Sequence, residues 1–212
     1  RLDSGDLAYL SKKARKMLDE AGFDYVKIIA SNQLNEHVIK SLQKDQNAKI
    51  DAFGIGTELI TGKEDAALDG VYKLTETNGE PKMKISENIE KVTLPGKKQL
   101  YRCLDEDGCF YRDAVALAEE KEQDLEHIFH PVYPERFTTI KNCSRHALLQ
   151  TVVESGKNIN KEKTPAEIHA YLTSRSVLLP DEHKRFISPH IYKVGITKAL
   201  LDARNELSKK LE

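Results

Sequence analysis

The pattern of hydrophobic and polar positions in the first part of the chain alternates between a helical period and short continuous apolar runs. A β-branched run at residues 25–30 and a second run at residues 50–53 predict two buried strands. Two helices are also predicted, and their apolar stripes are Leu7, Leu10, Ala14, Met17, Leu18 and Ala21, which end at Gly22, and then Leu34, Val38, Ile39 and Leu42. The order strand end, helix, strand, helix, strand favours parallel strands joined by crossover helices.

The pattern changes after about residue 66 and predicts a β-rich segment with hairpins. The expected strands span residues 71–75, 81–86, 99–104 and 109–112, the last two joined by an acidic turn at 105–108. The period is helical again from Phe137 onward, and the stripes are Ala147, Leu148, Val152 and Val153, then Ile168, Tyr171 and Leu172, and finally Leu200, Ala203, Leu207 and Leu211. We therefore expect three parts, which are the end of an α/β domain at 1–75, a β-rich segment at 76–135 and a helical C-terminal appendage at 136–212.

Composition narrows the range of partners. Of the 212 residues, 39% are hydrophobic and 32% are charged, and the formal net charge is -1. This balance provides no electrostatic attraction toward nucleic acid or an anionic membrane, so neither is expected as a partner. No apolar run approaches the roughly 18 residues that a membrane-spanning helix needs. The cysteine count of 3 is odd, which argues against a secreted disulfide framework and favours a reducing, cytoplasmic compartment.

The chain begins with Arg1 rather than Met, and a charged turn at 1–6 directly precedes the first predicted helix. An ordered turn of this kind needs a strand that enters it. The sequence therefore predicts that this chain is a piece of a longer protein, and that part of any site built at the turn lies upstream.

Polar residues and glycines fall where the predicted strands finish. Asp3, Asn32 and Gly56 are separated by 29 and 24 residues, about one strand-helix unit each. Because the carboxyl ends of parallel strands meet at one edge of a sheet or barrel, we expect these residues to share that edge, where ligands bind.

The segment Gly54-Ile55-Gly56-Thr57 has the residue types that a phosphate group requires. Glycines let the backbone approach an anion, successive N–H groups can point at its oxygens, and the threonine hydroxyl adds a donor. The alternative is a tight turn that needs unusual φ angles. The segment is not a dinucleotide fingerprint, because Leu59 stands where that motif has its third glycine.

The opening residues also have two interpretations. Arg1 offers a planar cation for an aromatic carboxylate or a phosphate, and Asp3 offers an acceptor for ribose hydroxyls or a metal. Helix capping by Asp3 or Ser4, with Asp6 near the positive end of the helix dipole, is the alternative. It leaves Arg1 unexplained, because a cation beside a helix N-terminus is unfavourable unless an anion lies between them. Asn32 either forms a local turn or faces a ligand.

The cysteines and histidines that could bind a metal are expected to have ordinary structural roles. Cys103, Cys109 and Cys143 lack the spacing of a zinc site. His127 and His130 are expected in a surface loop, and no direct metal ligand is predicted in this chain.

Taken in order, the segments 1–6, 30–32 and 53–57 resemble the C-terminal half of the nicotinate phosphoribosyltransferase family. The segments 70–74, 81–87 and 91–98 are similar to what that family carries after its phosphate loop. The resemblance implies part of a (β/α) barrel of the type II phosphoribosyltransferase kind, followed by the β-rich segment and the helical tail. It also implies formation of nicotinate mononucleotide and pyrophosphate from nicotinate and phosphoribosyl pyrophosphate, with ATP hydrolysis, in NAD salvage.

The same resemblance implies roles for individual residues. Arg1 would contact nicotinate, Asp3 would be the catalytic carboxylate facing the ribose and its magnesium-bound pyrophosphate, and Asn32 would neighbour the ribose. Gly56 and Thr57 would hold the 5-phosphate. Mg²⁺ or Mn²⁺ is implied as cofactor, ATP as co-substrate and a homodimer as the full-length assembly.

The family's phosphorylated histidine belongs to an upstream segment, so this chain alone is expected to be inactive. Two alternatives stay open at this point. One is a non-catalytic interaction module that retains a relic of the barrel, and the other is a different phosphate-binding barrel enzyme.

Overall fold

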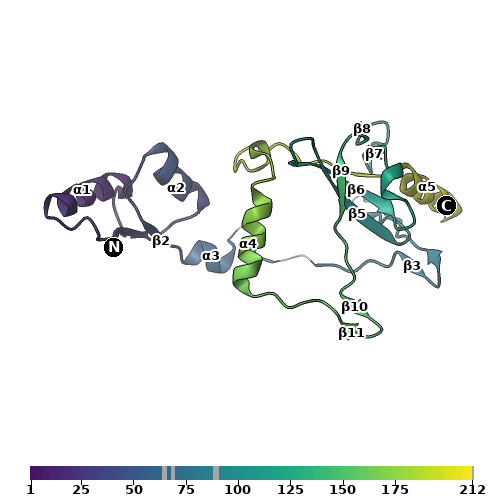
Figure 1. Cartoon of the computed structure of the whole chain (residues 1–212), viewed down its shortest axis with the longest axis horizontal. Helices are drawn as coiled ribbons and strands as arrows, with labels where there is room; N and C mark the ends of the chain where they lie inside the picture. The colour runs from purple at the N-terminus through teal and green to yellow at the C-terminus, as the bar shows by residue number, and fades with distance from the viewer. Residues whose placement is uncertain (64–65, 68–69, 88–90, 212) are drawn as a thin grey trace. The chain divides into compact units, whose positions relative to one another are not determined.

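The computed structural model describes residues 1–63, 66–67, 70–87 and 91–211. The chain forms two compact units, Arg1–Val71 and Tyr72–Glu212 (Figure 1). Each unit has its own hydrophobic core. No helix in the described ranges is long and apolar enough to cross a membrane.

The first unit alternates helices with short parallel strands. Its elements are α1 (Leu7–Glu20), β1 (Ile29–Ser31), α2 (Glu36–Lys40) continued by a π-helical turn (Ser41–Asp45), β2 (Ala52–Gly54) and α3 (Thr57–Thr61). β1 and β2 pair in parallel, with Ala30 opposite Phe53, and Leu2 makes a parallel bridge to Ala30 on the other side of β1. The predicted parallel pairing with crossover helices is therefore confirmed.

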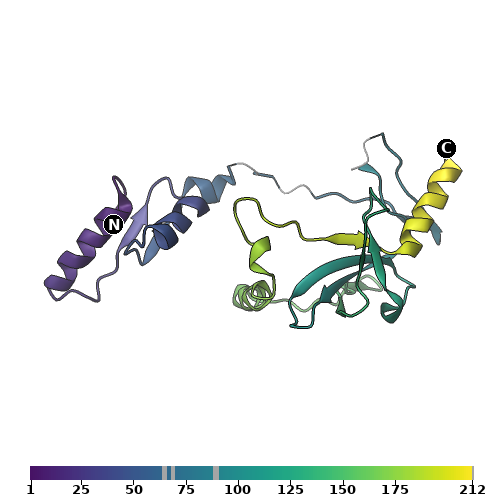
Figure 2. The ribbon, with the colours of Figure 1, turned by 90° about the horizontal axis from the view of Figure 1, so that it is seen from above.

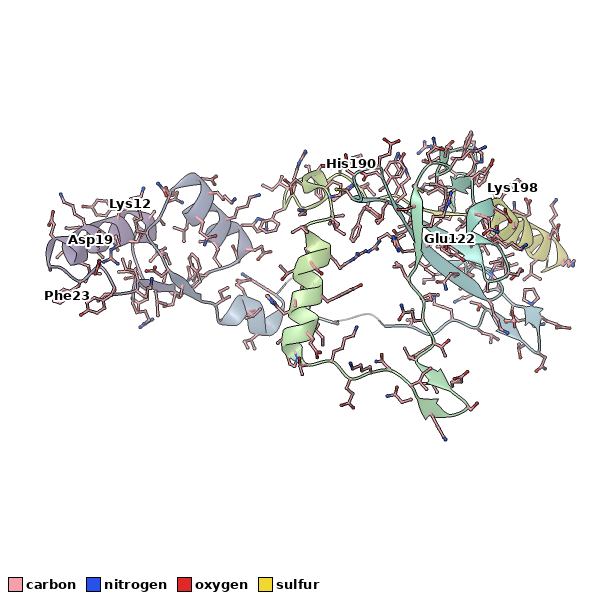
Figure 3. All side chains as sticks on the ribbon, in the orientation of Figure 1. Lys12, Asp19, Phe23, Glu122, His190 and Lys198 are labelled. Carbon is pink, nitrogen blue, oxygen red and sulfur yellow. The ribbon has the colours of Figure 1, made fainter. Side chains whose placement is uncertain are left out.

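A core of apolar side chains joins these elements. Its buried members are Ala8, Ala30, Leu34 and Leu42. The polar side of α1 faces away from this core, and Lys12 and Asp19 project from it (Figure 3). β1 is shorter than the predicted strand at 25–30, because the N–H of Ile28 donates to Asp51 Oδ2 at 2.7 Å and not to a neighbouring strand.

The second unit is built on one mixed sheet of six strands in the order β8-β7-β12-β6-β5-β9. These strands are β5 (Lys98–Leu104), β6 (Phe110–Leu117), β7 (His127–Phe129), β8 (Phe137–Thr139), β9 (Ser144–Ala147) and β12 (Val194–Ile196). The other elements are two hairpins, β3 (Glu76–Thr77) with β4 (Glu80–Pro81) and β10 (Val153–Glu154) with β11 (Lys157–Asn158), and the helices α4 (Pro165–Ser176) and α5 (Lys198–Leu211). The chain runs from β12 directly into α5 (Figure 2).

β6 shows how the sheet separates two cores. Ala114 and Ala116 belong to a cluster with Cys103, whereas Val115 and Leu117 pack against the cluster of α5. Successive side chains of a strand point to opposite faces, so both faces of β6 are covered. The β5–β6 hairpin is as predicted, but β6 runs five residues beyond the expected end at 112, because a strand buried on both faces shows no alternation.

Two predictions for the middle of the chain are wrong. The segment 71–75 is not a strand: no described strand pairs with it, and Val71 and Tyr72 are exposed. Of the expected strand at 81–86, only Pro81 lies in a strand, at the end of the small β3–β4 hairpin.

The prediction of a helical region from Phe137 onward is wrong for part of that region. β8, β9 and β12 come from this region and pair with strands from 76–135, so both predicted segments contribute to one sheet. The apolar residues that were predicted to form a helical stripe from Ala147 onward are not in a helix. Ala147 lies in β9, where it pairs with Tyr101, and Val153 lies in the β10–β11 hairpin. The predicted helices α4 and α5 are present, and the side chain of Leu211 lies outside the described ones.

Gly195 in β12 provides a stability test of the sheet. A Cβ added there would lie 2.7 Å from Ile128 Cβ and 3.0 Å from the carbonyl oxygen of Phe129. Gly195→Ala is expected to lower the free energy of unfolding by about 1–3 kcal/mol, measured by urea denaturation, because two packed strands must separate. Gly70→Ala is the matched control, since no atom in the described part of the chain lies within 4 Å of its added Cβ. Equal stability of the two variants would contradict the packing described.

Candidate functional site

The carboxyl ends of the parallel strands of the first unit form a common edge. Leu2 bridges to Ala30 and Ser31 pairs with Gly54, so the residues that follow these positions leave the sheet on the same side. The expectation that the polar strand ends share one edge agrees with this register. Ligands bind at the corresponding edge of open α/β sheets and barrels.

Arg1 and Asp3 form a pair at this edge. Arg1 Nη2 lies 2.9 Å from Asp3 Oδ2, and Arg1 Nη1 donates to Ser31 Oγ at 2.8 Å. The side chains are 62% and 48% exposed, so this ion pair adds little to stability. The two contacts hold the guanidinium above β1 while solvent still reaches it.

Asn32 ties the end of β1 to the opening turn. Its side-chain Nδ2 donates to the backbone carbonyl of Asp3 at 3.0 Å. Asn32 and Gln33 have φ angles of 76° and 49°, in the left-handed region that few residues other than glycine adopt. The chain therefore keeps a costly backbone conformation at the strand end, beside Asp3.

The capping explanation of the opening residues is wrong in its choice of residue. Asp6 is the N-cap of α1, and its Oδ1 accepts from the N–H of Tyr9 at 2.9 Å. Asp3 is therefore not required to cap the helix, and it pairs with Arg1 instead.

The glycine loop connects β2 to α3. Gly56 precedes the helix and Thr57 is its first residue, and both are exposed. Neither Gly54 nor Gly56 has a positive φ, and Gly56 has φ and ψ angles of -109° and -100°. No atom of the described residues lies within 4 Å of a Cβ added to Gly56, so these residues leave the space beside this backbone open.

The remaining candidates from the sequence have structural roles. Asp105 Oδ1 accepts from the N–H groups of Asp107 and Cys109 and thereby shapes the acidic hairpin turn. His127 lies in β7 rather than in a loop, and His130 Nδ1 accepts from two backbone N–H groups of the following turn. The cysteines are free thiols, and burial raises the pKa of Cys103 to about 12. No cluster of three or more metal-type ligands occurs in the described residues.

A buried charged network in the second unit was not predicted. Arg102 donates through Nε and Nη2 to the two carboxylate oxygens of Asp113, at 3.0 and 2.9 Å, and the hydroxyl of Tyr192 donates to the same carboxylate at 2.9 Å. Burial raises the pKa of Tyr192 strongly. Arg102 lies in β5 and Asp113 in β6, whereas Tyr192 lies in a loop 79 residues after Asp113. No local sequence pattern therefore predicts the network.

The first unit has the arrangement of an α/β protein, a class in which ligands bind at the carboxyl edge of parallel strands. The family model described as the nicotinate phosphoribosyltransferase C-terminal domain matches residues 97–204, about half of the chain. The chain belongs to the nicotinate phosphoribosyltransferase family.

Individual relatives agree with this assignment. A nicotinate phosphoribosyltransferase of Bacillus subtilis is 42% identical over 205 residues, which cover 93% of this chain and 42% of the relative. The human protein of that name is 32% identical over 216 residues, covering 98% and 40%. The crystal structure of human nicotinic acid phosphoribosyltransferase matches with a TM-score of 0.77 and 28% identity, over 98% of this chain and 40% of that one. The chain thus spans about two fifths of the length of these relatives.

Proposed function

We propose that this chain is the C-terminal part of an enzyme that forms nicotinate mononucleotide and pyrophosphate from nicotinate and phosphoribosyl pyrophosphate. ATP hydrolysis drives the reaction, and the product enters NAD salvage. The observation that carries the proposal is the family match, together with the Arg1–Asp3 pair and the glycine loop that follow neighbouring parallel strands. The enzyme is proposed to be a cytoplasmic homodimer at full length.

The first unit is proposed to supply successive strands of a (β/α) barrel. Leu2, β1 and β2 lie side by side in parallel, and a helix connects each to the next. Both sides of this short sheet need further strands to close a barrel, and the family proteins have chain length outside the part matched here. The barrel's carboxyl edge would then carry the whole site.

Each proposed role follows from the chemistry at this edge. Displacement at the anomeric carbon passes through a cation-like sugar while pyrophosphate leaves, so a fixed carboxylate stabilises the transition state. Asp3 is proposed to provide that charge, and Asn32 to neighbour the ribose. Arg1 is proposed to orient the carboxylate of nicotinate, and the open backbone of Gly56 with the hydroxyl of Thr57 to hold the 5-phosphate.

The described residues of the proposed site offer a divalent cation one carboxylate, that of Asp3. Mg²⁺ usually binds through one or two carboxylates together with substrate phosphates and water. Asp3 is a half-exposed carboxylate at the edge, and no cluster of three or more metal-type ligands occurs in the described ranges. We therefore propose that Mg²⁺ or Mn²⁺ is held chiefly by the pyrophosphate, with Asp3 facing it. When bound, the ion neutralises charge on the leaving group.

The phosphate assignment is tested by Thr57→Val in the full-length enzyme. The variant is expected to raise KM for phosphoribosyl pyrophosphate by about tenfold, because a hydrogen bond to a charged group is lost. The measurement is steady-state release of pyrophosphate that depends on nicotinate.

Thr61→Val is the control on the same helix. The hydroxyl of Thr61 donates to the carbonyl of Thr57 at 2.8 Å and is one turn further from the loop. Near-normal KM in both variants would reject the phosphate site, and a wild-type enzyme without nicotinate-dependent turnover would favour the interaction-module alternative.

A further inference from the structure

The second unit contains a pocket that the proposed reaction does not use. Its volume is about 470 Å³, within the range of small-molecule sites. Most of its lining is apolar, and the lining residues are Met83, Val92, Leu94, Pro131, Val132, Arg204, Asn205 and Ser208. α5 provides the polar side, since Arg204, Asn205 and Ser208 all belong to this helix.

Arg204 is held in place by neutral groups only, as far as the described residues go. Its Nε and Nη2 donate to Asn205 Oδ1 at 3.3 and 3.1 Å, and Nη1 donates to the carbonyl oxygen of Pro131. A guanidinium has five N–H donors, so one N–H on each terminal nitrogen remains available. The side chain is thus fixed, with a pair of donors left over.

Among the described residues that line the pocket, none carries a negative charge to compensate this guanidinium. Arg204 is half-buried, and burial lowers its pKa. No carboxylate occurs among the described residues that line the pocket. A cation removed from water and paired only with neutral oxygens attracts an anion more strongly than an exposed one does.

We propose that this pocket binds a small monocarboxylate with an apolar body. Two N–H groups on adjacent nitrogens suit the two oxygens of a carboxylate, and the apolar wall beside them suits a hydrocarbon chain or ring. A phosphate dianion fits less well, because Arg204 is the one cation among the described lining residues. The proposal stands apart from the transferase function, since the residues involved belong to the second unit.

The two methionines of the chain make a direct test available. Met83 lines the pocket, whereas Met17 lies on the exposed surface of α1 in the other unit. The chain is labelled with methyl-¹³C methionine and titrated with sodium hexanoate, and NMR records both methyl signals. We expect a saturable shift of the Met83 signal alone. Hexanamide, which is similar in shape and uncharged, is expected to bind at least tenfold more weakly.

Arg204→Gln is expected to weaken hexanoate binding at least tenfold. Arg185→Gln, an exposed arginine outside the pocket lining, removes the same charge and is expected to leave binding unchanged. An unmoved Met83 signal in the wild-type chain overturns the proposal. Equal affinity for hexanoate and hexanamide overturns the role of Arg204 even where the Arg204 variant fails to fold.

Discussion

Asp3→Asn in the full-length enzyme is expected to lower kcat by about 10²–10³-fold, because the substitution removes a fixed charge that faces the developing sugar cation. The change keeps the size of the side chain. It removes the ion pair with Arg1, but that pair is largely exposed and contributes little to folding. The thermal unfolding midpoint should therefore stay close to that of the wild type. The measurement is kcat for pyrophosphate release at saturating nicotinate and phosphoribosyl pyrophosphate.

Asp6→Asn is the matched control for this prediction. Asp6 caps α1 through a hydrogen bond from the N–H of Tyr9, and asparagine caps helices about as well as aspartate. This variant loses a carboxylate three residues from Asp3 and should keep wild-type turnover. If Asp3→Asn retains kcat within threefold, or if both variants lose activity equally, Asp3 is not the catalytic carboxylate.

The shared edge of the parallel strands was predictable because its determinants are local and periodic. Asp3 directly follows Leu2, which bridges to β1, and Asn32 directly follows the last residue of β1. The helical stripe between them sets the length of this strand-helix repeat. The register of Leu2, Ala30 and Phe53 then aligns the strand ends. What the pattern did not reveal is which residue caps α1, since Asp3, Ser4 and Asp6 are all good capping types.

The failures in the second unit arise from pairing between distant segments. Ala147, Leu148, Val152 and Val153 fit a helical stripe, but β9 pairs with β5, and Ser155-Gly156, both with positive φ, turns the chain between β10 and β11. The serine-glycine pair was a local turn signal that favoured a hairpin. The partner strand β5, in contrast, lies more than 40 residues upstream, where no periodicity analysis of the segment can find it.

The polar features that were missed depend on the same distant pairing. Arg102 and Asp113 become neighbours only through the β5–β6 register, in which they are directly opposite. Arg204 reaches its pocket because α5 packs beside the loop that contains Pro131. About a third of the residues are charged, so the sequence alone does not show which charged side chains are buried. The tertiary structure is needed to distinguish the buried charged side chains from the solvent-exposed ones.

Asp113→Ala is expected to lower the free energy of unfolding by about 3 kcal/mol, measured by urea denaturation. Asp113 is 7% exposed in its side chain and accepts two hydrogen bonds from Arg102, so its loss leaves a desolvated guanidinium without its partner. Breaking a buried ion pair typically costs ~3–5 kcal/mol. The lower end applies here because Arg102 is 26% exposed and its guanidinium also lies 4.3 Å from the centre of the Phe110 ring.

The double variant Arg102→Met with Asp113→Leu separates the cost of an unpaired charge from the value of the pair. Well-packed apolar replacements for a buried ion pair are often neutral, so the double variant should regain more than half of the stability lost in Asp113→Ala. Glu126→Ala is the surface control, since Glu126 pairs with Lys141 at 3.0 Å and both side chains are more than half exposed. That control should show no measurable change. A loss in Asp113→Ala as small as in the control would mean that solvent screens the Arg102 charge, and that the network does not contribute to the free energy of unfolding.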